Sequence, residues 1–595
     1  MAGSWFNALR RPPFTGLAVS IWVFYLFCTV ILPYGPIRHG IFPDPDDYMY
    51  LTQTLDWLRG QGWYDITEYR LDPPHGTALH FFHLIEIPLA AIILPLHWCG
   101  VSWVTAATIA ACIWPLVLLA GLLAALRWVA ADFMPRAWVG FTALMLLFMS
   151  PLLLDYMPGR VHHHGIVMLV IMLAFGCAVR VLTNPQHLRW GAGVGFLLAL
   201  AMGIGLEALP WVALISGWLL LWSMVQGRSA ALAASIFGAS LFLGSAFMVM
   251  LLLPPSQWFS NNLVAYSVVY AYFAGGIACA FAGTALAART QLIWLRYVAG
   301  IGLAAAAAGL FFSAFPELLG GPWGAVDKVI KIIMVDETIE AIPLFRFSGI
   351  AITEFAFVPV ITFISMIVFW RQLPRGAEWA WGLLALLLCA ALVLTLFYQS
   401  RYIPYAQLFS IVPLVAMIQR GLPWLAQKWP RRRFQILKYA LITLLVLNIL
   451  IAPIQFQFGI PRGDLHALAA ILNDPHTYGD RRRIIIDTMD EGAELLFRTD
   501  HTVLSAPYHT DVAGNLDSFR FFLTPDPGLA EWIAHARHAD LVFMNSATFV
   551  PQADQGKPLE QTTFAYQLAS GRVPGWLKRI DVPLPENYYL FEVVE

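Results

Sequence analysis

Hydrophobic residues form long runs along most of this chain, and polar residues are confined mainly to the segments between the runs. A helix needs about 20 consecutive, mainly apolar residues to cross a bilayer. By this measure we expect thirteen membrane spans, near residues 14–34, 102–126, 137–155, 164–183, 190–208, 210–226, 229–253, 263–287, 294–315, 349–370, 379–398, 402–419 and 437–457. The pattern predicts a mainly α-helical, polytopic membrane protein.

One further apolar run, Leu84 to Trp98, is shorter than the others. It carries Glu86 and contains Pro88 and Pro95. A run of about 15 residues is short for a span, so we expect an interfacial or re-entrant segment here.

Basic residues between the runs predict the orientation. If Leu84–Trp98 does not cross and the N-terminus is cytoplasmic, then Arg10, Arg11 and the dense group Arg431–Arg433 fall on the inner side, as the positive-inside rule requires. If the run did cross, the Arg431–Arg433 group would lie outside. We therefore predict thirteen spans in the inner (plasma) membrane, with the C-terminal segment periplasmic or extracellular.

The chain changes character at about Phe458, after which it is polar and mixed. Apolar runs there predict strands at Arg482–Asp487 and Asp540–Met544, and helices at Asp490–Arg498 and Leu529–Ala539. We therefore expect two domains, a transmembrane domain over residues 1–457 and a small α/β domain over residues 458–595 on the outer face.

The amino-acid composition argues against several classes of function. The chain is 59% hydrophobic and only 12% charged, with a net charge of −1, and it has no basic block suited to nucleic acid. Its six cysteines all fall in apolar stretches at unrelated spacings, which indicates neither a disulfide framework nor a thiolate metal site.

Three carboxylates, Asp44, Asp46 and Asp47, lie within four positions just after the first apolar run. Acids at a membrane surface are costly unless they face water or bind something. They precede a segment, Tyr48 to Arg59, that we expect to be a short amphipathic helix capped by Asp46 or Asp47 and ended by Gly60.

The predicted topology returns other polar residues to the same face. They are Arg160 and His162–His164, Glu340 with Glu337 as its rival in the 316–348 loop, and Tyr398 beside Arg401. Glu207, at the end of its span before Pro210, is expected to have a structural role.

The order of these motifs resembles the GT-C fold glycosyltransferases, most closely the catalytic subunit of oligosaccharyltransferases. In that family an acidic motif follows the first span, and a second acidic motif opens the fourth. A Glu in the last large external loop is followed three residues later by Pro, and an Arg lies near the start of a late span. The matching residues here are Asp44–Asp47, His162-His163-His164-Gly165, Thr338-Ile339-Glu340 with Pro343, and Arg401.

The resemblance implies transfer of a sugar or oligosaccharide from a polyprenyl phosphate or diphosphate donor on the outer face. It implies a catalytic domain over residues 1–457, with Asp46, Asp47 and Glu340 as catalytic residues. It implies that Arg401, Tyr398 and Arg160 bind the donor phosphate. It implies a divalent metal, Mn²⁺ or Mg²⁺, on ligands drawn from Asp44, Asp47, His162, His164 and Glu340.

Two departures from the family pattern change these expectations. His162 and His164 stand where the family has carboxylates, and imidazoles suit transition metals better than Mg²⁺. A protonated His against the donor phosphate is the alternative. The family's Trp-Trp-Asp motif for the Asn-x-Ser/Thr acceptor is missing, and the nearest polar stretch is Ala506–Asp511. The missing motif argues against transfer to a protein asparagine, so the expected acceptors are a glycolipid or a polysaccharide, with a protein as the alternative.

A transporter or flippase of lipid-linked sugars is the alternative from another class. Such a protein needs charged residues in the middle of its spans and paired broken helices. This sequence instead places nearly all its acids at the predicted outer ends of the spans. The distribution favours an enzyme.

Overall fold

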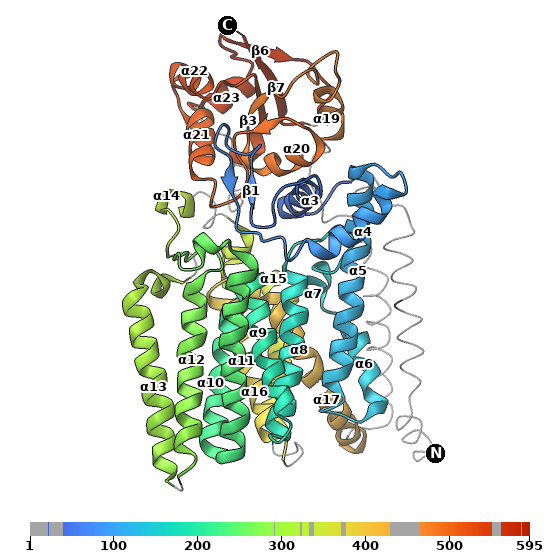
Figure 1. Cartoon of the computed structure of the whole chain (residues 1–595). Helices are drawn as coiled ribbons and strands as arrows, with labels where there is room; N and C mark the ends of the chain where they lie inside the picture. The colour runs from blue at the N-terminus through green and yellow to red at the C-terminus, as the bar shows by residue number, and fades with distance from the viewer. Residues whose placement is uncertain are drawn as a thin grey trace.

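The computed structural model describes Trp22 and residues 40–290, 292–321, 324–332, 338–370, 376–428, 465–549, 561–584 and 586–594. Predicted span 437–457, the Arg431–Arg433 group, Glu337 and, apart from Trp22, span 14–34 lie outside these residues. A bundle of long helices carries the C-terminal domain at one end (Figure 1).

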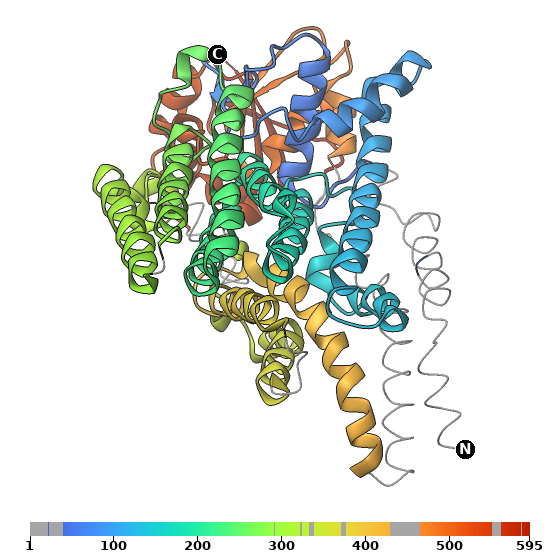
Figure 2. The ribbon, with the colours of Figure 1, turned by 60° about the horizontal axis from the view of Figure 1, so that its bottom comes forward.

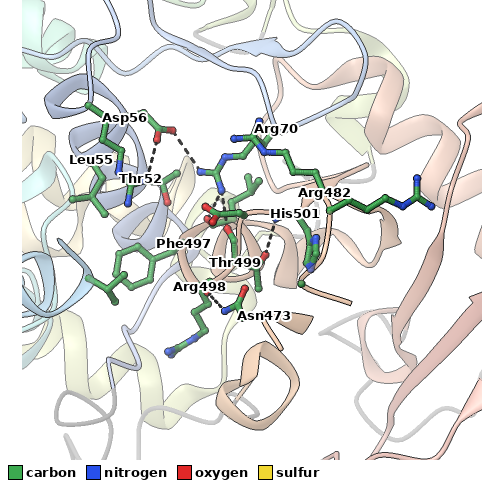
Figure 3. A pocket seen from close by; sticks show the side chains of 16 residues that line it. Thr52, Leu55, Asp56, Arg70, Asn473, Arg482, Phe497, Arg498, Thr499 and His501 are labelled. Atoms are coloured by element: carbon green, nitrogen blue, oxygen red, sulfur yellow. Dashed lines mark hydrogen bonds and ion pairs between the residues drawn. The ribbon is translucent and has the colours of Figure 1, made fainter. Parts of the chain in front are cut away.

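Within the described residues, nine helices are long and apolar enough to cross a membrane. They contain α5 (Trp103–Ala130), α8 (His164–Thr183), α10 (Leu209–Gln226), α11 (Arg228–Leu252), α12 (Val268–Ala287), α13 (Ile293–Ala314), α15 (Gly349–Val368), α16 (Glu378–Phe397) and α17 (Ile403–Lys428). Both views place α13 at the edge of the bundle (Figure 2). These helices coincide with nine predicted spans, and the polytopic α-helical fold class is confirmed.

Two of the predicted spans do not form single long helices. The run 137–155 is divided into α6 (Arg136–Leu146) and α7 (Ser150–Leu154), so the prediction of one continuous helix was wrong there. Pro151 lies in the first turn of α7, where its missing N–H and fixed φ favour the start of a new helix. The run 190–208 forms the 17-residue α9 (Leu188–Ile204) and the short η3 (Leu206–Ala208).

The short run Leu84–Trp98 contains α4 (Ile87–Trp98), a helix of 12 residues. At 1.5 Å per residue such a helix is roughly 18 Å long, well short of a hydrocarbon core of about 30 Å. Its length agrees with the prediction that this run does not cross.

The first loop contains α3 (Pro45–Leu58), which lies between the bundle and the C-terminal domain (Figure 1). The helix begins three residues earlier than predicted. Asp44 is its cap, because Pro45 occupies the first helical turn and the Asp44 side chain accepts a hydrogen bond from the N–H of Asp46. The predicted cap, Asp46 or Asp47, was therefore wrong, and both residues lie in the first turn.

The C-terminal domain contains a five-stranded sheet in the order β4-β3-β5-β7-β6. Strands β3, β4 and β5 are parallel, and β7 pairs antiparallel with β5 and β6. The strands are β3 (Ile484–Asp487), β4 (Thr502–Val503), β5 (Leu541–Asn545), β6 (Leu577–Ile580) and β7 (Tyr588–Val593). The helices are α19 (His466–Leu472), α20 (Gly492–Arg498), α21 (Val512–Leu523), α22 (Pro527–Ala536) and α23 (Phe564–Ala569). The predicted α/β character is confirmed.

Contacts with the C-terminal domain hold the first loop in place. Arg70 donates hydrogen bonds to the carbonyls of Leu496 and Thr499, each at 2.8 Å. The hydroxyl of Tyr508 donates to the carbonyl of Pro45 at 3.3 Å, directly at the start of α3. These contacts with the C-terminal domain thus fix the position of the acidic first turn of α3.

Candidate active site

The candidate active site lies where the bundle meets the C-terminal domain. The ends of several elements converge there: the first turn of α3, the turn before α8, η3 before α10, η7 (Ile339–Ala341) and η10 (Ser400–Tyr402) before α17. These elements carry Asp46 and Asp47, His162–His164, Glu207, Glu340 and Arg401, respectively.

Asp47 is fully buried and fixed by the backbone of the turn before α8. Its Oδ1 accepts hydrogen bonds from the N–H groups of Val161 at 2.8 Å and His162 at 3.2 Å. Burial raises the pKa of Asp47 to about 7, although Arg160 and the two N–H groups oppose the shift. This carboxyl therefore titrates near neutral pH.

Arg160 lies among the acids rather than beside an open cavity. Its Nη1 is 3.2 Å from Asp44 Oδ2 and 3.5 Å from Asp47 Oδ2. Its Nη2 donates to His162 Nε2 at 3.0 Å and lies 3.7 Å from Asp155 Oδ1. Burial lowers the pKa of Arg160, but the surrounding carboxylates, Asp47 first, outweigh it and hold the guanidinium charged. We call these five residues the Arg160 cluster.

A second group extends from His164. Its Nδ1 lies 2.6 Å from Glu207 Oε2, and the other oxygen of Glu207 accepts a hydrogen bond from Tyr405 at 2.8 Å. On its far side, His164 Nε2 is 3.9 Å from Glu340 Oε2, which in turn lies 3.8 Å from Arg401 Nη2. Glu340 therefore links the histidines to the late-span arginine.

Asp46 is half-buried, between the two groups. Its pKa is raised well above the ordinary value, first by burial and then by the charges of Asp44, Asp47 and Glu340, while His164 opposes the shift. Since both Glu340 and His164 act on this carboxyl, the first turn of α3 faces the second group as well.

Among the residues that the structure describes, one set of side chains fits a metal ion. His163, His164 and Glu207 each offer a ligand atom, and these atoms lie within 4.8 Å of one another. The Nδ1 of His163 is engaged with the hydroxyl of Tyr50 at 3.0 Å, which orients the ring, as outer-shell partners of metal-bound histidines do. Two imidazoles and a carboxylate suit Mn²⁺ or Zn²⁺ better than Mg²⁺.

The Arg160 cluster fits a metal less well. Asp44, Asp47 and His162 were predicted as ligands, yet all three contact the Arg160 guanidinium. The predicted set of five ligands is thus divided between two groups, because His164 and Glu340 belong to the second.

The three residues predicted to bind the donor phosphate differ in how far their side chains are exposed. Arg401 and Tyr398 keep 20% and 37% of their surface exposed, so a ligand can reach both. A Cβ added to Gly321, whose φ is +78°, would lie 2.9 Å from the Tyr398 hydroxyl, so the 316–348 loop approaches this ring closely. Arg160, at 13% exposure, is nearly enclosed by its partners.

Sequence reasoning missed two members of the site. Asp155 was placed at the end of a span, and Glu207 was given a structural role, although it contacts His164 directly. The available signal for Glu207 was an acid within an apolar run, which is costly without a partner. The Arg160 cluster could be found only from the fold, because Asp155 and Asp47 approach from different elements.

No protein-family model and no curated protein sequence matches the chain. Solved structures of the oligosaccharyltransferase AglB from Archaeoglobus fulgidus do match it. The complex with an inhibitory peptide and a dolichol-phosphate matches with a TM-score of 0.68 and 13% identity, over 89% of this chain and 69% of that one. This chain has the GT-C fold of the oligosaccharyltransferases.

Two further AglB structures support the same GT-C assignment. One, tethered to an acceptor peptide containing the NVT sequon, matches with a TM-score of 0.68 and 12% identity, over 97% of this chain and 75% of that chain. The other, a complex with Zn and sulfate, matches with a TM-score of 0.63 and 12% identity, over 96% and 74%. The GT-C fold predicted from the order of motifs is confirmed.

Proposed function

We propose that this chain is a membrane glycosyltransferase. It transfers a sugar or oligosaccharide from a polyprenyl phosphate or diphosphate donor to an acceptor on the outer face of the inner membrane. The observation that carries the proposal is the convergence of Asp46, Asp47, Glu340 and Arg401 beside the histidines at one end of a GT-C bundle.

The reaction exchanges one bond at the anomeric carbon for another. The acceptor heteroatom forms a bond to that carbon, the bond to the phosphate oxygen breaks, and the lipid phosphate leaves with the electron pair. Negative charge then grows on the leaving oxygen, where a fixed cation lowers the barrier. Arg401, with the Tyr398 hydroxyl, has the charge, hydrogen-bond donors and exposure for this role.

The acceptor proton goes to a carboxylate in the first turn of α3. Asp46 is the half-buried member, whereas Asp47 is held by backbone N–H groups and Arg160. A base works best when its pKa lies near the operating pH, and burial raises the pKa of both carboxyls. We assign Asp46 as the base and Asp47 as the group that positions α3 against the turn before α8.

A divalent metal, when bound, supplies positive charge to the donor phosphate. His163, His164 and Glu207 are the residues that would hold it, with Mn²⁺ favoured over Mg²⁺ by the imidazoles. Glu340 lies next to this set and keeps its carboxylate between His164 and Arg401.

The acceptor is a glycolipid, a polysaccharide or a protein. Two imidazoles lie at the boundary with the C-terminal domain, since the rings of His80 and His509 are 4.7 Å apart. Burial lowers the pKa of His80 well below its ordinary value and that of His509 to about 4, so both rings are neutral at pH 7. A neutral acceptor hydroxyl or amide suits this environment.

The proposal is tested with purified protein in proteoliposomes that contain glycolipid or glycan acceptors and a polyprenyl-phosphate donor carrying a radiolabelled sugar. We expect release of free polyprenyl phosphate by the wild type, in parallel arms with Mn²⁺ or Mg²⁺, and a loss of at least 100-fold in Asp46→Asn/Asp47→Asn. Asp132→Asn is the matched control, because Asp132 pairs with Arg180 at 2.9 Å near the opposite end of α5. Donor turnover in the double variant equal to that in Asp132→Asn would contradict the site.

A further inference from the structure

The position where the acidic motif of the first loop faces the turn before α8 already holds a cation. Arg160 Nη1 lies between Asp44 and Asp47, and Nη2 lies between His162 and Asp155. Nitrogen–oxygen and nitrogen–nitrogen distances of 3.0–3.7 Å are those of hydrogen-bonded and ion-paired groups.

The guanidinium is built into this position. Gly159 adopts a φ of +97° and its N–H donates to the carbonyl of Ala111 in α5 at 2.8 Å. The N–H of Arg160 itself donates to the carbonyl of Met157 at 3.0 Å. Because the chain is tied to α5 at Gly159 and to the Asp47 carboxylate at Val161, the Arg160 side chain emerges at a fixed point beside the acids.

A divalent ion bound by the same carboxylates would need ligand bonds of about 2.0–2.6 Å. Its ligands Asp44 Oδ2 and Asp47 Oδ2 are both shared with Arg160 Nη1. The ion would therefore lie against a like charge that is 87% enclosed, since only 13% of the Arg160 side chain is exposed. The acid cluster as it stands does not fit a metal.

His162, which stands where the family has a carboxylate, is a member of the Arg160 cluster. A carboxylate at this position would add a further anionic ligand, whereas the imidazole accepts a hydrogen bond from Arg160 Nη2 at 3.0 Å. An imidazole nitrogen that accepts from a guanidinium N–H adds no negative charge to the cluster, so the ring is a neutral partner for Arg160 there.

We infer that Arg160 is the resident cation of the Asp44–Asp47 cluster and takes the place that a divalent metal would otherwise have there. Arg160 acts as a positioning residue, since it contacts Asp47 and Asp44 and only 13% of its side chain is exposed. Metal binding is left to His163, His164 and Glu207. The inference deepens the proposed function, but metal binding can be measured without any sugar donor, so the two fail separately.

Mn²⁺ binding to the purified full chain, followed by electron paramagnetic resonance of the free ion, tests the inference. In the wild-type background, Asp47→Asn is expected to leave the Mn²⁺ stoichiometry unchanged. Arg160→Gln is expected to gain one Mn²⁺ per chain, and Arg160→Gln/Asp47→Asn to lose that gain. Arg160→Lys is the control, since it keeps a positive charge and should gain no site.

Two results would overturn the inference. One is loss of a wild-type Mn²⁺ site in Asp47→Asn. The other is no gained site in an Arg160→Gln protein that is monodisperse and melts cooperatively. If Arg160→Gln does not fold, the Asp47→Asn arm decides, because that variant keeps an oxygen at Oδ1 to accept the hydrogen bonds from Val161 and His162.

Discussion

Asp47 Oδ1 accepts a hydrogen bond of 2.8 Å from the N–H of Val161, which lies 114 residues later in the chain. The contact joins the first turn of α3 to the turn that precedes α8. It brings the acidic motif and the histidines into one site, although neither segment is a membrane span. Oδ1 of Asp47 thus holds α3 against the turn before α8, whereas Oδ2 carries its charge toward Arg160.

Substitutions at Asp47 should separate these two roles. Asp47→Ala leaves two buried N–H groups unpaired, at a cost of about 1–3 kcal/mol each, so its melting temperature in detergent should fall. Asp47→Asn keeps the acceptor and should melt within a few degrees of the wild type, while its transfer rate drops by at least 10-fold. An Asp47→Asn protein as unstable as Asp47→Ala would show that the charge, rather than the acceptor, holds α3.

The pKa of Asp47 gives stability a defined pH dependence. Burial raises this pKa from 3.8 to about 7, so the folded chain binds the proton more tightly than the unfolded chain does. The resulting stability is fully present below about pH 4 and is lost as pH rises through 7. Between pH 5 and 8, the melting temperature of the wild type should therefore fall more than that of Asp47→Asn, as measured by thermal unfolding in detergent. Parallel curves would contradict the raised pKa.

Hydropathy predicts the helices well because each span buries its own backbone hydrogen bonds and depends little on its neighbours. Nine predicted spans are continuous helices, and the short run 84–98 contains a helix too short to cross. The runs 137–155 and 190–208 were the exceptions, and in the first of them Pro151 starts a new helix within an otherwise apolar stretch. Hydropathy averaged over the run does not reveal the missing N–H of Pro151, and so it does not predict the start of a new helix there.

The site was predictable only in part. The order of motifs predicted Asp46, Asp47, Glu340 and Arg401, and the structure brings their elements together, while their roles stay a prediction. It could not indicate that Arg160 faces Asp155 and Asp44 rather than an exposed ligand site. Which partner a cation takes depends on side-chain directions set by packing of distant segments, and no local pattern encodes them.

Arg401 is expected to act mainly on the leaving phosphate. Removing a hydrogen-bond donor or charge from a group that stabilises developing negative charge typically costs 10²–10³-fold in kcat. Arg401→Gln should therefore lower kcat by about that factor, and Arg401→Lys by less, because it keeps the charge but loses the planar fork. Donor-release rates measured over a range of donor concentrations, up to saturation, give both kcat and KM. A change confined to KM in both variants would assign Arg401 to ground-state binding instead.

Glu207 is predicted to belong to the site although it lies in an apolar run. Its two oxygens contact His164 at 2.6 Å and Tyr405 at 2.8 Å, so Glu207→Gln removes the charge that faces His164 but keeps an acceptor for Tyr405. We expect this variant to lose Mn²⁺ binding at His163 and His164 and to lower the transfer rate by at least 10-fold. Tyr405→Phe removes the hydrogen bond alone and should retain the Mn²⁺ stoichiometry with a smaller fall in rate. Full Mn²⁺ binding in Glu207→Gln would remove Glu207 from the ligand set and return it to the structural role that its position in the span first indicated.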